Sequence, residues 1–208
     1  MQNRKMPIQN MDKCSIYYSH LLSNNKPNNY IYFAYKNDTR VWNILDGNGN
    51  FKFKNWFRFY INEFEDEFNF TELKISLPKV IQDETGRFNI ITRNGELITN
   101  EWFYDIKYLS YEFKQLIRKD GTSKLVFHDR FISDFNFTNV IKTESPLLFI
   151  VQRETDLLWN IIYPNGSFFF EDWYFKIDDI SSEYCTFKAI DKNGTSIIKD
   201  QFYCTMAC

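Results

Sequence analysis

WNILDGNGNFKFKNWF, at residues 42–57, is the stretch that decides the fold, because the chain repeats its pattern twice more. The second copy is FNIITRNGELITNEWF at residues 88–103, and the third is WNIIYPNGSFFFEDWY at residues 159–174. Each copy begins aromatic-Asn-Ile-aliphatic, continues to Asn-Gly, and reaches a Trp-aromatic pair at a fixed distance beyond the glycine. Repetition of this kind predicts a chain of stacked supersecondary units.

The repeated positions are candidates for a shared structural role rather than for chemistry. A periodic core needs the same large side chain in every unit, whereas a ligand site is usually needed once. The tryptophans are therefore expected to pack between successive hairpins. The structural repeat positions are Trp42, Asn43, Gly49, Trp56, Phe88, Asn89, Gly95, Trp102, Trp159, Asn160, Gly166 and Trp173.

The Asn-Gly pairs predict tight hairpin turns, because they supply positive φ angles at little steric cost. A two-residue turn would place Asn43 opposite Lys54 and Asn160 opposite Glu171. A longer turn with a glycine bulge would shift the pairing by one residue and exchange the two faces of each strand. The sequence leaves both registers open.

The remaining sequence extends the pattern into a continuous array. An apolar strand and a polar turn precede each copy, and residues 113–123 resemble residues 187–196 as a second, shorter kind of hairpin. The predicted fold is mainly β, an antiparallel meander of repeated β-hairpins over residues 30–208. Its ends either close into a barrel or propeller-like array, or stay open as edges.

Residues 1–29 form a separate N-terminal segment in this interpretation. Within residues 11–22, apolar side chains recur at spacings of three and four, which predicts a short amphipathic helix. The run Ser-Asn-Asn-Lys-Pro-Asn-Asn at residues 23–29 then ends it.

Composition excludes several classes of function. The chain has 25 basic and 27 acidic residues and no basic stripe, so nucleic-acid binding is not indicated. No stretch has the length and apolarity of a membrane span or of a signal peptide, which predicts an intracellular (bacterial cytoplasm) or virion location. Cys14, Cys185, Cys204 and Cys208 show no pairing pattern and are expected to be reduced thiols.

Chemical motifs are few, and each has a simpler interpretation. Residues 46–50 begin like a calcium loop, but Phe51 and Phe57 stand where glycine and glutamate are needed, so a hairpin turn is favoured. His128 precedes Asp129 without the motif of a nucleophile or a metal site. We expect no catalytic, cofactor-binding or metal-binding residues, no cofactor, and no enzymatic activity.

The motif resembles that of the bacterial WG-repeat family, whose members carry Trp-Gly-aliphatic-Ile-Asp-x-x-Gly before an extended strand. Residues 42–49 and 159–166 match its length and its Trp and Gly positions, and residues 187–194 match its second half. Asn replaces the family's second-position glycine in all three copies, a variant similar to proteins of Bacteroidales and of crAss-like phages. The resemblance covers residues 30–203 and implies a non-catalytic β-rich scaffold.

Three functions are therefore compared. The first is a protein-interaction or structural module, working with protein partners or assembly neighbours, for example in a phage virion. The second is a carbohydrate-binding module that displays Trp56, Trp102 and Trp173 as an exposed aromatic row. The third is an enzyme of unrecognised type using His128 or the acidic segment near Glu65. Residues 1–29, 61–79 and 125–146 break the repeat and are expected to carry function more than the motif itself.

Overall fold

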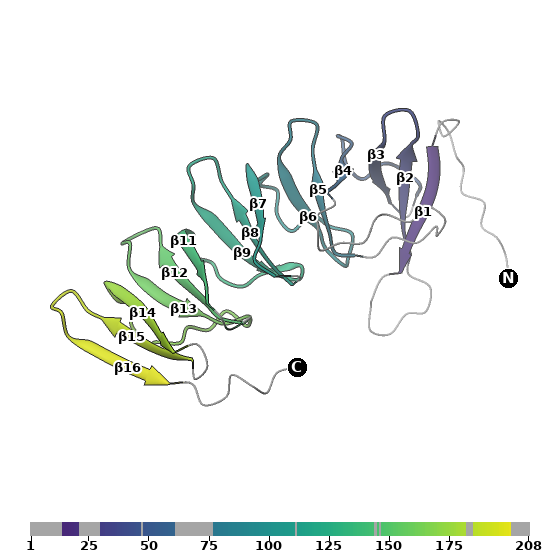
Figure 1. Cartoon of the computed structure of the whole chain (residues 1–208). Coiled ribbons are helices and arrows are strands. Elements are labelled where there is room, and N and C mark those ends of the chain that lie inside the picture. The colour runs from purple at the N-terminus through teal and green to yellow at the C-terminus, as the bar shows by residue number, and fades with distance from the viewer. Residues whose placement is uncertain are drawn as a thin grey trace. The chain divides into compact units, whose positions relative to one another are not determined.

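The regular structure consists of β-strands. The computed structural model describes residues 14–20, 30–46, 48–60, 77–110, 112–143, 145, 147–181 and 185–200 of the chain. This part contains sixteen strands and no helix, which confirms the predicted mainly β fold (Figure 1). The chain divides into two compact units, Met1–Tyr104 and Asp105–Cys208, and the boundary falls directly after the second copy of the motif.

Unit 1 holds two antiparallel sheets of three strands each, with the orders β1-β2-β3 and β4-β5-β6. Strands β3 and β6 carry the beginnings of the first and second motif copies. The six strands are β1 (Cys14–His20), β2 (Tyr30–Lys36), β3 (Val41–Leu45), β4 (Arg58–Phe59), β5 (Lys79–Gln82) and β6 (Phe88–Ile91).

Unit 2 holds a seven-stranded sheet and a three-stranded sheet. The larger sheet has the order β13-β12-β11-β9-β8-β7, with β10 also paired to β9, and the smaller has the order β14-β15-β16. The ten strands are β7 (Asp105–Tyr108), β8 (Phe113–Ile117), β9 (Ser123–Phe127), β10 (Arg130–Phe131), β11 (Phe137–Lys142), β12 (Phe149–Arg153), β13 (Trp159–Ile162), β14 (Lys176–Ser181), β15 (Thr186–Ile190) and β16 (Ser196–Asp200).

Of the fifteen pairs of described strands that follow one another in sequence, eleven are joined antiparallel, so the predicted meander of hairpins is confirmed. Among the described strands every sheet stays open, and the closed barrel is therefore not formed. Both edges of β2 are occupied, by β1 and β3, and β16 pairs with β15. The last described strand, β16, therefore does not pair with β2.

The predicted helix over residues 11–22 is wrong where the structure describes it. Cys14–His20 is strand β1, paired antiparallel with β2 from Cys14 opposite Lys36 to His20 opposite Tyr30. Its sequence, CSIYYSH, is rich in aromatic and β-branched residues that suit a strand, and β2 offers an edge to pair with. Residues 11–13, 21 and 22 lie outside the described part of the chain.

The six turns that end in glycine share one geometry, which resolves the register. In each turn, the residue three positions before the glycine makes two backbone hydrogen bonds. Its N–H donates to the carbonyl of the residue that follows the glycine, and its own carbonyl accepts the N–H of the glycine. This is a type I turn closed by a left-handed glycine bulge. The glycines are Gly49, Gly86, Gly95, Gly121, Gly166 and Gly194, with φ between 73° and 87°. The longer turn is thus the one adopted.

Among the described residues, unit 1 has one hydrophobic core and unit 2 has two. In unit 1, Phe33 and Ile44 of the first sheet pack with Ile81 and Ile91 of the second, so a single core joins the two sheets. In unit 2, successive residues of β13 enter different cores. Ile161 packs with Phe187, and Ile162 packs with other side chains of the larger sheet, because neighbouring side chains on a strand point to opposite faces.

Cys185 differs from the expectation of reduced thiols. Its side chain is buried in a core of unit 2, and it is disulfide-bonded. The expectation was wrong because it rested on the spacing of cysteines along the sequence, whereas a disulfide depends on their proximity in the fold.

Candidate functional site

The repeated Asn residues replace a missing stretch of β-ladder. In each copy the returning chain pairs with the motif strand at two bridges, such as Leu45 with Phe51 and Trp42 with Phe57. Between these bridges, residues 43 and 44 of the strand oppose residues 52–56, so the returning segment arches away. Its backbone groups need other partners at this point.

The Asn side chain supplies those partners. Asn160 donates from Nδ2 to the carbonyls of Phe170 and Asp172, at 3.0 and 2.9 Å. Its Oδ1 accepts the N–H groups of Ile161 and Phe170, at 2.7 and 3.2 Å. Asn43 and Asn89 make three corresponding bonds each, and all three Asn residues are fully buried. The cross-strand pairs expected from a two-residue turn therefore do not form.

The tryptophans are packed rather than displayed. Trp42 is buried and the other four are half-buried. Trp102 packs against the core of unit 1, and Trp173 against a core of unit 2. The Trp56 ring lies under the Lys36 ammonium, whose nitrogen is 4.3 Å from the ring centroid.

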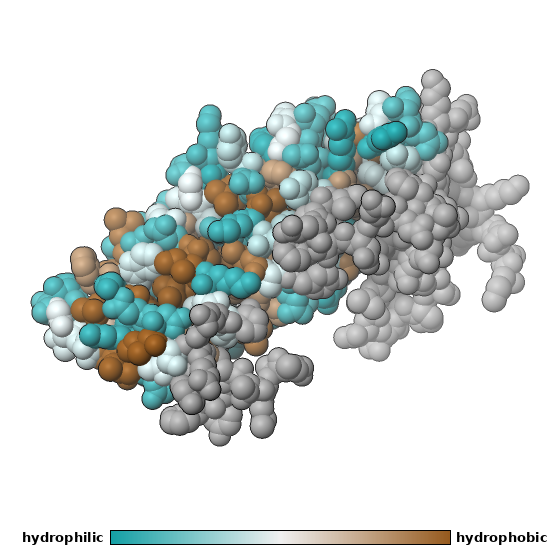
Figure 2. Space-filling model, viewed as in Figure 1, coloured by the Kyte–Doolittle hydropathy of each residue, from teal (hydrophilic) through white to brown (hydrophobic). Residues whose placement is uncertain are grey.

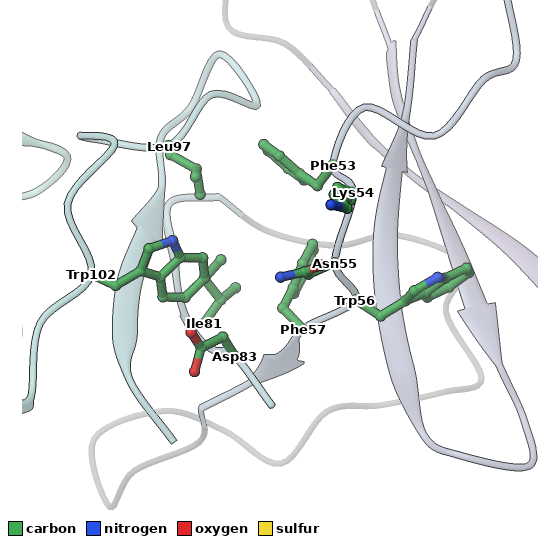
Figure 3. Close-up of a pocket in the computed structure, with 9 residues that line it drawn as sticks. All are labelled: Phe53, Lys54, Asn55, Trp56, Phe57, Ile81, Asp83, Leu97 and Trp102. Atoms are coloured by element: carbon green, nitrogen blue, oxygen red, sulfur yellow. The ribbon is translucent and has the colours of Figure 1, made fainter. Parts of the chain in front are cut away.

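The arch of the first copy and residues in and just before the second copy line an open pocket of about 180 Å³ within unit 1. Residues 53–57 form one side, and Ile81, Asp83, Leu97 and Trp102 form the other (Figure 3). The Trp102 ring faces this space, whereas the Trp56 ring points away from it (Figure 3).

Asp83 shapes the edge of the pocket but has little free capacity to bind. Its Oδ1 accepts from the N–H and hydroxyl of Thr85 and from the N–H of Arg87. Its Oδ2 accepts from the Arg87 guanidinium at 2.9 and 3.2 Å. Burial acts to raise the pKa of Asp83, but the hydrogen bonds from Thr85 and Arg87 and the positive charge of Arg87 together lower it below 3.8.

The lowered pKa of Asp83 makes a pH-dependent contribution to stability. A carboxyl whose pKa is lower in the folded state stabilises the fold at pH values above 3.8, and this contribution is lost as the pH falls through the folded pKa. We expect Asp83→Asn to lower the free energy of unfolding by about 1 kcal/mol at pH 7, and the difference from wild type to shrink below pH 3.8. Urea unfolding across pH 2–7, followed by tryptophan fluorescence, measures it.

Asp38→Asn is the control for this experiment, because Asp38 lies in the exposed turn between β2 and β3 and bonds only locally, to Thr39. An Asp83→Asn deficit that stays constant down to pH 2 would contradict the role of the ionised carboxylate.

The other candidate residues make local contacts where the structure describes them. His128 lies 3.4 Å from a carboxylate oxygen of Glu112 in unit 2, beside the Phe127 ring. Glu65 lies outside the described residues. Asp46 accepts the N–H groups of Asn48 and Asn50, as a turn-capping residue does. In the described part of the chain no group of three or more His, Cys, Asp or Glu residues could hold a metal ion.

The sequence does not predict the pocket, although it marks Trp102 as a repeated position of the motif. Phe53, Lys54 and Asn55 fall in the arch, whose course depends on the glycine bulge and the Asn bonds and not on strand periodicity. Asp83 carried a signal, since Asp-Glu-Thr-Gly at residues 83–86 has the residues of a turn.

Comparisons with known proteins leave the family open. No protein-family model matches the chain, and no curated protein matches it. The resemblance to WG repeats therefore stays a prediction from the motif. Among the described residues no helix is long and apolar enough to cross a membrane.

Proposed function

We propose that this chain is a non-enzymatic β-repeat module that binds protein partners or assembly neighbours. The observation that carries the proposal is the edge strand β16. All five of its residues are exposed, including Ile197 at 47% and Ile198 at 61%. Apolar patches interrupt the polar surface over the C-terminal strands (Figure 2). Exposed edge strands of this kind pair readily with another chain.

The corresponding strand within the repeat supports this proposal. β9 follows the same kind of glycine turn as β16 and occupies the same place in its hairpin. Its outer edge is paired with β10 and, at Ser123, with β11, and Leu125 and Val126 are buried. A β-strand from a protein partner, added to the edge of β16, would cover Ile198 as β9 has its counterpart, Leu125, covered.

The motif suggests a setting for such a partner. WG-like repeats with the Asn variant are similar to proteins of crAss-like phages, so a virion or another large assembly is the proposed context. No specific contact favours the carbohydrate-binding alternative, since Trp56, Trp102 and Trp173 are half-buried.

A photo-crosslinking residue at position 197 of the full-length chain tests the proposal. We expect a discrete product with a partner protein or a second copy, mapped by mass spectrometry to residues 196–200. Ile198→Lys should abolish the product with little change in stability, because Ile198 is already exposed and surface substitutions cost about 0.5 kcal/mol or less.

Leu157→Lys is the matched control, since Leu157 is 57% exposed but lies in the turn between β12 and β13. It should leave the product unchanged. A chain that sediments as a monomer and gives no product at position 197, or a product that survives Ile198→Lys, would overturn the proposal.

A further inference from the structure

The size of the pocket beside Trp102 limits what it can hold. Sites for drug-sized ligands and cofactors have volumes of roughly 300–1,000 Å³. An apolar protein cavity of about 150 Å³ is enough to bind benzene. At about 180 Å³, this pocket has room for one ring and little more.

The walls favour an apolar ring. Phe57 and Ile81 are buried, and Phe53, Leu97 and Trp102 pack around them as half-buried side chains. The polar side chains at the pocket are Lys54 and Asn55, both exposed, and Asp83, whose two oxygens already accept bonds from Thr85 and Arg87. A sugar needs several well-placed hydrogen-bonding groups, whereas an aromatic ring needs mainly apolar area.

The third copy of the motif shows what can cover this tryptophan. Trp173 corresponds to Trp102, and Phe168 corresponds to Leu97. The Phe135 ring lies 5.6 Å from Trp173 and 5.8 Å from Phe168, and the Arg153 guanidinium lies 4.3 Å from Trp173. In the third copy, therefore, an aromatic ring supplied by the chain itself packs on the tryptophan, while in the second copy the described residues leave a pocket there.

We propose that the pocket beside Trp102 binds one aromatic side chain, Phe or Tyr, of a protein partner. Lys54 at the rim favours an acidic residue next to that aromatic residue in the partner. The inference rests on the proposed function only in taking the partner to be a protein. The pocket lies in unit 1 and strand β16 in unit 2, so either can fail without the other.

Ligand titration of the full-length chain with ¹⁵N-labelled tryptophan tests the pocket directly. The chain has five indole signals, which single Trp→Phe variants assign. p-Cresol, the side-chain analogue of tyrosine, should shift the Trp102 signal saturably, with a dissociation constant on the order of 1 mM. The Trp173 signal should stay in place, because Phe135 and Arg153 already cover that ring.

Two substitutions at one position provide opposite controls. Leu97→Phe introduces the residue of the third copy, fills the pocket and should remove the response to p-cresol. Leu97→Ala enlarges the pocket and should keep it. Thermal melting of both variants verifies that they are folded.

Peptide probes test the expected charge preference. Acetyl-Glu-Phe-amide should bind about twofold to fivefold more tightly than acetyl-Lys-Phe-amide, and Lys54→Glu should reverse the order. The pocket proposal is overturned if p-cresol gives no saturable shift at Trp102, if folded Leu97→Phe responds as wild type does, or if methyl β-glucoside binds more tightly than p-cresol. Equal binding of the two peptides would overturn the acidic preference.

Discussion

Gly166→Ala is expected to lower the free energy of unfolding of unit 2 by about 2–5 kcal/mol. Two causes add. Gly166 has φ of 87°, in the left-handed region that costs an L-residue roughly 1–2 kcal/mol. An added Cβ would also lie 2.0 Å from the carbonyl oxygen of Ile132. That oxygen belongs to the backbone and cannot rotate away, so the chain must shift, at about 1–3 kcal/mol.

The repeat itself provides the control. Gly194 has φ of 83° in the same kind of turn, but an added Cβ would meet nothing within 4 Å. Gly194→Ala should therefore cost only the backbone term, about 1–2 kcal/mol. Urea unfolding of the full chain, followed by near-ultraviolet circular dichroism, measures both. Equal losses in the two variants would show that the contact with Ile132 is unimportant.

Asn160→Ala is expected to lower the free energy of unfolding by about 3–5 kcal/mol. The substitution removes four hydrogen bonds and leaves the carbonyls of Phe170 and Asp172 and the N–H groups of Ile161 and Phe170 without their partner. Asn160 is fully buried, and each unsatisfied buried group costs about 1–3 kcal/mol, reduced where the segment relaxes toward water. Denaturant unfolding measures the loss.

Asn160→Asp tests the donor role of the Asn160 amide separately from its acceptor role. It keeps the oxygen that accepts from Ile161 and Phe170 but turns a carboxylate toward the two carbonyls, so it should destabilise at least as much as alanine. Asn165→Ala is the control, because the exposed Asn165 side chain bonds only to Ser167 in the turn. It should cost about 0.5–1 kcal/mol. A loss at Asn160 no larger than at Asn165 would refute the bridging role.

The meander could be predicted from the sequence because its signals are local. Aliphatic runs and turn residues mark each hairpin, and the Asn-Gly glycines do adopt positive φ. Three features could not be derived in this way. The spacing of apolar residues in 14–20 fits a helix as well as a strand, and the strand forms because β2 is available to pair with it. The turn register follows from hydrogen bonds around each glycine, and the role of Asn160 depends on an arch that no periodicity encodes.

The candidate pocket could be predicted only in part, for the same reason. Trp102 is marked in the sequence because the motif repeats a tryptophan at this position, but the residues that line the pocket with it, 53–57, belong to the first copy. Their approach depends on how the two sheets of unit 1 pack through Phe33, Ile44, Ile81 and Ile91. Packing between repeats is a three-dimensional property, so it determined both the pocket and the covering of Trp173.

The arch held by the buried Asn has a consequence for how such a chain can diversify. Its backbone is fixed at two bridges and by one amide, none of which depends on the side chains between them. Those positions read Lys-Phe-Lys-Asn at residues 52–55, Ile-Thr-Asn-Glu at residues 98–101 and Phe-Phe-Glu-Asp at residues 169–172. The frame is thus constant while the arch side chains differ in role: Phe169 and Phe170 are buried in a core of unit 2, whereas residues 54 and 55 are exposed. At the exposed arch positions, such as 54 and 55 or 171 and 172, the side chain can therefore change while the frame keeps its hydrogen bonds.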